Sequence, residues 1–133
     1  MIDGVADTHA ALWYVFGDPR LSASAKSVFE TAASSRHKIV VSVISLAEVV
    51  YLVEKGRLSA TAYADLQRAL HDFDHVLQEA PVTAEIIDAM RDVPRVEIPD
   101  MPDRIVAATA LYFGVPAISR DGRIRASNIQ TVW

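Results

Sequence analysis

Short apolar segments that favour strands alternate along this chain with longer segments that have the apolar spacing of helices. The clearest strand is Ile39–Val41, a β-branched run typical of a buried strand. Further strands are expected at residues 4–6, 76–80, 115–119 and 130–133. This alternation predicts an α/β fold with a central, mainly parallel sheet covered by helices on both faces.

Residues that favour helix ends bound the expected helices. Ser45 and Glu48 have the spacing of a capping box, and Gly56 is a suitable residue to follow the end of that helix. Asp103 is expected to cap a helix that runs to Phe113 and ends at Gly114. The remaining helices are expected from His9 to the break at Gly17, from Ser24 to about Ser34, from Ser59 to Phe73, and from Thr83 through Met90. Three prolines predict a rigid, largely non-helical loop over residues 93–102.

Size and composition limit the protein classes to consider. With 133 residues, 51% of them hydrophobic and 23% charged, the chain is expected to form a single domain, residues 1–133. Cysteine is absent, so disulfides and thiolate sites are excluded. We find neither a secretory signal nor a membrane span, and we expect a soluble, cytoplasmic protein. A net charge of −4 gives no overall attraction to nucleic acid, so a polyanion would need local basic patches or bound metal.

Four acidic residues follow strand ends or begin the next helix: Asp7, Glu48, Asp103 and Asp121. Ligands of open parallel sheets bind outside the carboxyl ends of the strands, close to the point where the strand order reverses. A cluster of carboxylates without fixed counter-charge usually binds divalent metal. The pattern therefore predicts a shared acidic site.

Each acid also has a purely structural interpretation. Asp7 and Asp103 would each stabilise a helix by about 1 kcal/mol as N-caps. Glu48 would complete the capping box with Ser45, and Asp121 would begin an Asp-Gly turn. A capping carboxylate keeps one oxygen free for metal, so the two interpretations are compatible.

Other polar residues near the acids are weaker candidates. His9 lies beside Asp7, but a lone histidine after a strand more often packs or forms local hydrogen bonds. Arg120, Arg123 and Arg125 bracket Asp121 and are candidate RNA-binding residues that would hold phosphates beside the acids. The alternative for these arginines is a solvated turn.

Two other enzyme classes with this kind of fold fit poorly. A haloacid-dehalogenase-type phosphatase needs Asp-x-Asp after the first strand, where this chain has Asp7, Thr8 and His9. A phosphoryl-accepting receiver domain needs a lysine after a late strand, and the last lysine here is Lys55.

Four motifs, in this order, resemble those of PIN-domain ribonucleases, and most of all the VapC toxins of bacterial toxin–antitoxin pairs. They are Asp-Thr-His-x-x-x-Trp at 7–13, Ser-x-x-Glu at 45–48, Asp-Arg-x-x-x-Ala-x-Ala at 103–110, and Ser-x-Asp at 119–121. The resemblance covers essentially the whole chain. It implies a three-layer α/β/α sandwich and a Mg²⁺- or Mn²⁺-dependent endoribonuclease that leaves a 5′-phosphate and a 3′-hydroxyl.

The resemblance also implies roles for individual residues and partners. The family's acidic quartet, which binds metal and carries catalysis, falls on Asp7, Glu48, Asp103 and Asp121. Thr8 and Ser119 take supporting positions, although the family often has threonine where this chain has Ser119. Members are typically cytoplasmic homodimers that a cognate antitoxin silences. The expected contacts lie on the helix around Val49–Val53 and on the helix with Tyr63 and Leu66. The alternative function is a PIN-fold RNA- or protein-binding module without catalysis.

Overall fold

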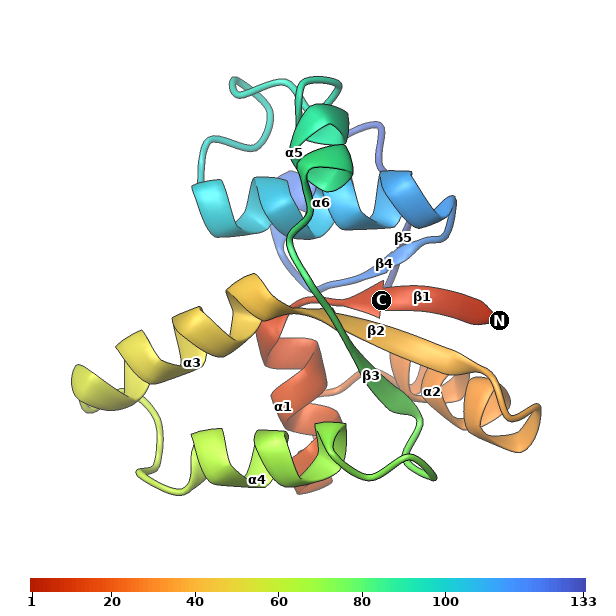
Figure 1. Ribbon diagram of the computed structural model, residues 1–133, viewed down its shortest axis with the longest axis vertical. Coiled ribbons are helices and arrows are strands. Elements are labelled where there is room, and N and C mark those ends of the chain that lie inside the picture. The colour runs from red at the N-terminus through yellow and green to blue at the C-terminus, as the bar shows by residue number, and fades with distance from the viewer.

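Five parallel strands form the central sheet in the order β3-β2-β1-β4-β5 (Figure 1), in a computed structural model that describes residues 1–133. The strands are β1 (Ile2–Ala6), β2 (Lys38–Ser42), β3 (Leu77–Ala80), β4 (Ala117–Ile118) and β5 (Thr131–Val132). In the centre, Val5 of β1 pairs with Val40 on one side and with Ala117 on the other. The predicted parallel sheet is confirmed.

Helices cover both faces of this sheet, so the three-layer sandwich is also confirmed (Figure 1). One layer contains α1 (Thr8–Phe16), α2 (Ala23–Ser34), α3 (Val43–Glu54) and α4 (Ala62–Leu70). The other contains α5 (Ala84–Met90), α6 (Met101–Phe113) and α7 (Gly122–Ala126). Helix α3 contacts both α1 and α6 and so links the two layers beyond the end of β2. None of these helices is long and apolar enough to span a membrane.

The two hydrophobic cores follow from the two-residue period of the strands. Ile39 and Val41 of β2 pack against the layer with α1 to α4, while Val40 between them packs against the layer with α5 to α7. Phe29 of α2 is fully buried in the first core and stacks on Tyr14 with ring centroids 4.3 Å apart. Burial of one such aromatic ring contributes about 1.5–3 kcal/mol, so this contact helps to fix α1, which begins directly after Asp7.

The central position of β1 places a reversal of strand order at its carboxyl end. The chain passes from β1 to β2 and β3 on one side, then returns to β4 and β5 on the other. Asp7 follows β1, and Ser119 follows the neighbouring strand β4. In sheets of this type such a reversal opens a crevice between the strand ends, where ligands bind.

Two helices begin earlier than the sequence predicts. The N-cap of α3 is Ser42, whose side chain accepts a hydrogen bond from the Ile44 backbone N–H, so Ser45 and Glu48 do not form a capping box. The N-cap of α6 is Asp100, and Asp103 lies within the first turn. Helix α6 can begin before Asp103 because Pro102 then lies in its first turn, where a residue without an N–H is tolerated.

The remaining differences concern element length. Helix α4 is confined to Ala62–Leu70 within the predicted range 59–73, and β4 contains only two residues of the predicted 115–119. Asp121 begins helix α7 rather than a simple turn. The predicted cap at Thr83 is confirmed, and Gly17 and Gly114 end α1 and α6 with φ of 62° and 66°, a left-handed conformation that favours glycine.

Candidate active site

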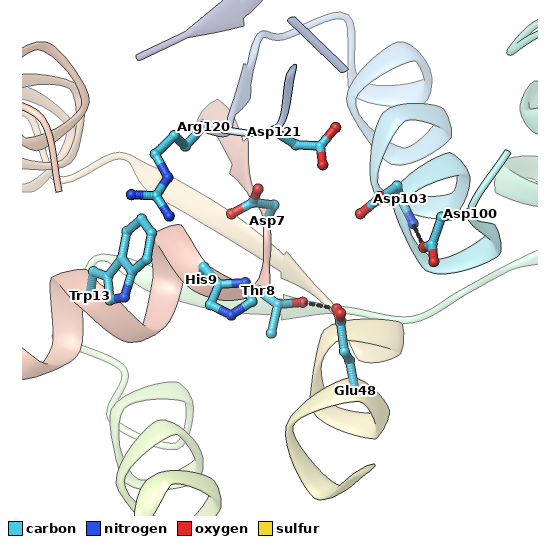
Figure 2. Close-up of a pocket in the computed structure, with 9 residues that line it drawn as sticks. All are labelled: Asp7, Thr8, His9, Trp13, Glu48, Asp100, Asp103, Arg120 and Asp121. Atoms are coloured by element: carbon cyan, nitrogen blue, oxygen red, sulfur yellow. Dashed lines mark hydrogen bonds between the residues drawn. The ribbon is translucent and has the colours of Figure 1, made fainter. Parts of the chain in front are cut away.

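A polar cavity of about 260 Å³ lies beyond the carboxyl ends of the strands (Figure 2). All four acids predicted from the sequence line it. The nine lining residues are Asp7, Thr8, His9, Trp13, Glu48, Asp100, Asp103, Arg120 and Asp121. Five of these carry carboxylates, so the cavity suits a cation or a ligand that arrives with cations.

Asp7 lies between β1 and α1, where it caps the helix and lines the cavity. Its Oδ1 accepts a hydrogen bond from the Ala10 backbone N–H at 2.9 Å, which makes it the N-cap of α1. Its Oδ2 accepts a hydrogen bond from the Ser119 hydroxyl. Burial raises the pKa of Asp7, and the hydrogen bonds from Ser119 and Ala10 offset only part of that increase.

Ser119 and Asp121 are positioned by the turn from β4 into α7. Ser119 is fully buried, and its Oγ also accepts a hydrogen bond from the Asp121 backbone N–H at 3.0 Å. Asp121 caps α7, because its Oδ1 accepts from the backbone N–H groups of Arg123 and Ile124 at 2.9 and 3.0 Å. One hydroxyl therefore connects the ends of β1 and β4 within the site.

Glu48 reaches the cavity from the second turn of α3. The buried hydroxyl of Thr8 donates a hydrogen bond to its Oε1 at 2.5 Å (Figure 2). Since Thr8 is the first residue of α1, this bond connects the helix that follows β1 to the helix that follows β2. Glu48 is half-buried, and the Oε2 atom makes no hydrogen bond within the protein.

Asp103, like Asp7, has an environment that disfavours its ionised form. Burial, followed by the nearby carboxylates of Asp100, Asp121, Glu48 and Asp7, raises the pKa of Asp103 to about 7. Neither oxygen of Asp103 takes part in a hydrogen bond within the protein. Such a group gains most from a nearby cation.

Asp100 is a site residue that the sequence analysis missed. Its Oδ1 accepts a hydrogen bond from the Asp103 backbone N–H at 3.0 Å, so it holds the first turn of α6 (Figure 2). The signal was present in Asp100-x-Pro102-Asp103, where an acid precedes a proline suited to the first helical turn. The sequence analysis instead placed Asp100 in the non-helical loop expected over residues 93–102.

The three arginines near Asp121 do not share one location. Arg120 lines the cavity and lies over the ring of Trp13, with its Cζ 4.6 Å from the ring centroid. His9 also lines the cavity, and its ring centroid is 5.6 Å from that of Trp13. Arg123 and Arg125 are exposed on α7 and do not line the cavity.

The carboxylates that line the cavity are suitable ligands for a hard divalent cation, although they do not converge on one position. No group of three or more His, Cys, Asp or Glu side chains lies close enough to hold a single ion in this conformation. Five carboxylates nevertheless line one cavity, with His9 as the only imidazole, and carboxylate oxygens are the ligands that Mg²⁺ and Mn²⁺ prefer. Mg²⁺ commonly binds through one or two carboxylates and keeps several waters, so it does not require a closed cage.

Comparison with known proteins agrees with this geometry. No curated protein matches the chain. A chain from the crystal structure of VapBC2 from Rickettsia felis bound to a DNA fragment from their promoter is 20% identical, with TM-score 0.70 over 98% of this chain and 97% of that one. A chain from a toxin–antitoxin complex from Klebsiella pneumoniae is 21% identical, with TM-score 0.65 over 98% and 97%.

A third structure, FitAcB from Neisseria gonorrhoeae, is 17% identical, with TM-score 0.61 over 98% of this chain and 96% of that one. At these identities the structural matches support the fold alone. The PIN domain matches residues 5–128, nearly the whole chain and every residue that lines the cavity. The chain therefore belongs to the PIN domain family.

Proposed function

We propose that this protein is a metal-dependent endoribonuclease that acts as the toxin of a type II toxin–antitoxin pair. The observation that carries the proposal is the set of five carboxylates around one cavity, where burial and then repulsion by the other four raise the pKa of Asp103 to about 7. None of these five carboxylates forms an ion pair within the protein, so the site is suited to Mg²⁺ or Mn²⁺ and, through the metal, to a phosphodiester.

Asp7, Glu48 and Asp103 are the proposed ligands of the metal, directly or through water, and Asp121 acts through water or a second ion. When bound, the metal supplies an activated water and neutralises charge on the phosphoryl group during in-line displacement. The protein's part is orientation. Ser119 holds Asp7 and the backbone of Asp121, and Thr8 holds Glu48.

The toxin assignment draws on the family and on the structural neighbours, two of which are described as VapBC2 and as a toxin–antitoxin complex. We propose that the protein is a cytoplasmic homodimer that a cognate antitoxin inhibits. Val49 and Leu66, within the segments expected to make these contacts, are fully buried. Within the segment Val49–Val53 the exposed apolar residues are Val50 and Tyr51, which are 39% and 55% exposed.

The proposal is tested by incubating the purified protein with single-stranded RNA in Mg²⁺ or Mn²⁺, with and without EDTA. We expect cleavage to need metal and to be lost in Asp7→Asn, because asparagine keeps the cap of α1 but removes the charge. Asp88→Asn, the same change at an exposed position of α5, is the matched control and should cut normally. Cleavage by folded Asp7→Asn at the rate of the wild type would remove Asp7 from the mechanism.

A second candidate function is RNA binding without catalysis. It is favoured by the absence of three acids placed to share one ion in this conformation. A pure binding module would bind RNA equally well with and without EDTA and would cut none of it. The same incubation, followed by a binding measurement, distinguishes the two functions.

A further inference from the structure

Arg120 is an exposed residue whose side chain lines the acidic cavity without forming an ion pair. Four arginines of the chain use their N–H groups within the protein; among them, Arg20 pairs with Asp18, and Arg104 donates to the backbone carbonyls of Met90 and Val93. Arg120 makes no hydrogen bond and no ion pair, although the carboxylates of the site line the same cavity. Its five N–H donors are therefore free for a ligand.

Trp13 holds Arg120 without using any of these donors. The guanidinium lies over the indole ring, 4.6 Å from its centroid, where the negative face of the ring attracts a cation. Figure 2 shows the two side chains facing each other at one end of the cavity, with Asp103 and Asp100 at the opposite end and Asp7 between them. The cavity thus has one cationic wall and one anionic wall.

The indole ring of Trp13, on which Arg120 lies, is buried and packed against other side chains. Trp13 is only 5% exposed and packs against Trp133, with centroids 5.7 Å apart. Arg20 also lies over the ring at 5.0 Å, but it is already bound to both oxygens of Asp18. Those hydrogen bonds lower the pKa of Asp18 to about 2, so at physiological pH Asp18 is ionised and Arg20 has an anionic partner.

We propose that Arg120 binds a phosphate of the RNA strand at the cationic wall of the cavity and that Trp13 is the residue that positions its guanidinium. The inference rests on the proposed function, because it takes RNA as the ligand. A planar guanidinium matches two phosphate oxygens at once, and stacking on an aromatic ring leaves the edge with its N–H groups directed outwards. RNA held there would extend towards the carboxylates, which are the proposed metal ligands.

This assigns phosphate binding in the cavity to one of the three arginines that follow β4. Arg123 and Arg125 lie on α7 and are exposed away from the cavity lining. Arg123 offers a matched control, because the same substitution there removes the same charge from the same short segment.

The test measures the binding of a fluorescently labelled single-stranded RNA in Mg²⁺ by anisotropy, with every variant made in the Asp7→Asn background so that the RNA stays intact. We expect Arg120→Gln to weaken binding about tenfold, as for a lost charge-assisted hydrogen bond, and Arg123→Gln to change it less than about twofold. Arg120→Gln should also reduce the slope of log Kd against log salt by about 0.7, the value for one phosphate contact on a single strand. Equal affinities for the two variants would overturn the proposal.

Two conservative variants test the positioning role of Trp13. Arg120→Lys keeps the charge but loses the planar stack, so we expect weaker binding with an unchanged salt slope. Trp13→Phe keeps a smaller ring, and we expect it to weaken RNA binding in the protein with Arg120 but not in the protein with Arg120→Gln. A purely structural role for Trp13 would give the same loss in both proteins and would remove it from the proposal.

The cleavage assay tests the proposed function, and the binding measurement tests the role of Arg120, so either proposal can be contradicted without the other. If the wild type does not cut RNA, the proposed function fails, while the contrast between Arg120→Gln and Arg123→Gln still decides the role of Arg120. If the wild type cuts RNA and both variants bind it as their parent does, only the inference about Arg120 fails. Absence of RNA binding by the parent protein would also overturn it.

Discussion

Ser119 and Asp7, which are 112 positions apart in the chain, are joined by a hydrogen bond from the serine hydroxyl to the aspartate carboxylate. The same hydroxyl accepts a hydrogen bond from the backbone N–H of Asp121. It therefore sets the relative position of two carboxylates that follow the adjacent strands β1 and β4. Catalytic metal sites depend on outer partners of this kind to orient their ligands.

Replacement of Ser119 by alanine should impair both stability and activity. It leaves a carboxylate oxygen of Asp7 and the N–H of Asp121 without their partner, at a cost of about 1–3 kcal/mol in the free energy of unfolding. RNA cleavage should fall about 10- to 100-fold, as for other lost partners of metal ligands. Chemical denaturation and initial cleavage rates measure the two effects. Ser59→Ala, at an exposed position, is the control, and equal rates for both variants would contradict the role of Ser119.

The raised pKa of Asp103 predicts a pH dependence of stability in the absence of metal. Its pKa rises from 3.8 to about 7 on folding, so between these values the native state binds a proton that the unfolded state has released. The free energy of unfolding should therefore decrease as the pH increases from about 4 to about 7. Asp7, whose pKa is also raised, contributes in the same direction.

Denaturation of the protein in EDTA across this pH range, with Asp103→Asn beside it, measures the contribution of Asp103. The variant cannot ionise at this position, so its stability should decrease less with pH. Saturating Mg²⁺ should also reduce the decrease in the wild type, since binding to the native state offsets the repulsion. Asp88→Asn should behave as the wild type. An equally steep decrease in Asp103→Asn would show that Asp103 does not carry the effect.

The fold could be predicted because strong local patterns agreed with the final packing. The β-branched run 39–41 and the left-handed glycines 17 and 114 marked a strand and two helix ends that the structure contains. The placement of the four acids at one sheet edge followed from the topology of parallel sheets, which requires no knowledge of side-chain contacts.

The details of helix starts could not be obtained from spacing alone. Ser45 and Glu48 fit a capping box, but Ser42 three positions earlier fits an N-cap as well, and α3 begins after Ser42. The separation of Arg120 from Arg123 depends on the direction of α7 and on Trp13, which is far away in the sequence. The separation of the two arginines has no local signal.

Thr8 offers a test of Glu48 that leaves the carboxylate itself unchanged. Thr8→Val keeps the shape of this buried residue but removes the donor to Glu48. Because Glu48 is half-exposed and regains water, we expect little change in melting temperature without metal. The affinity for Mn²⁺, measured by the metal-dependent shift in melting temperature, should fall about 10- to 100-fold. Thr8→Ser keeps the hydroxyl and should retain the shift, whereas a full shift in Thr8→Val would exclude the proposed support of Glu48.

Asp100 combines a structural and an electrostatic role that two substitutions separate. Asp100→Ala removes the cap of α6 and should lower the free energy of unfolding by about 1 kcal/mol. Asp100→Asn keeps an oxygen for the Asp103 N–H but removes the charge, which after burial is the largest cause of the raised pKa of Asp103. In EDTA at pH 8, Asp100→Asn should therefore be at least as stable as the wild type.

The metal requirement of these variants completes the test. Both remove one negative charge from the cavity, so both should need a higher Mg²⁺ concentration for half-maximal cleavage, although only Asp100→Ala is less stable. Titration of cleavage with Mg²⁺ alongside denaturation in EDTA gives the two quantities on the same proteins. If Asp100→Asn were as unstable as Asp100→Ala and had the Mg²⁺ requirement of the wild type, Asp100 would act on α6 alone and its charge would have no part in the site.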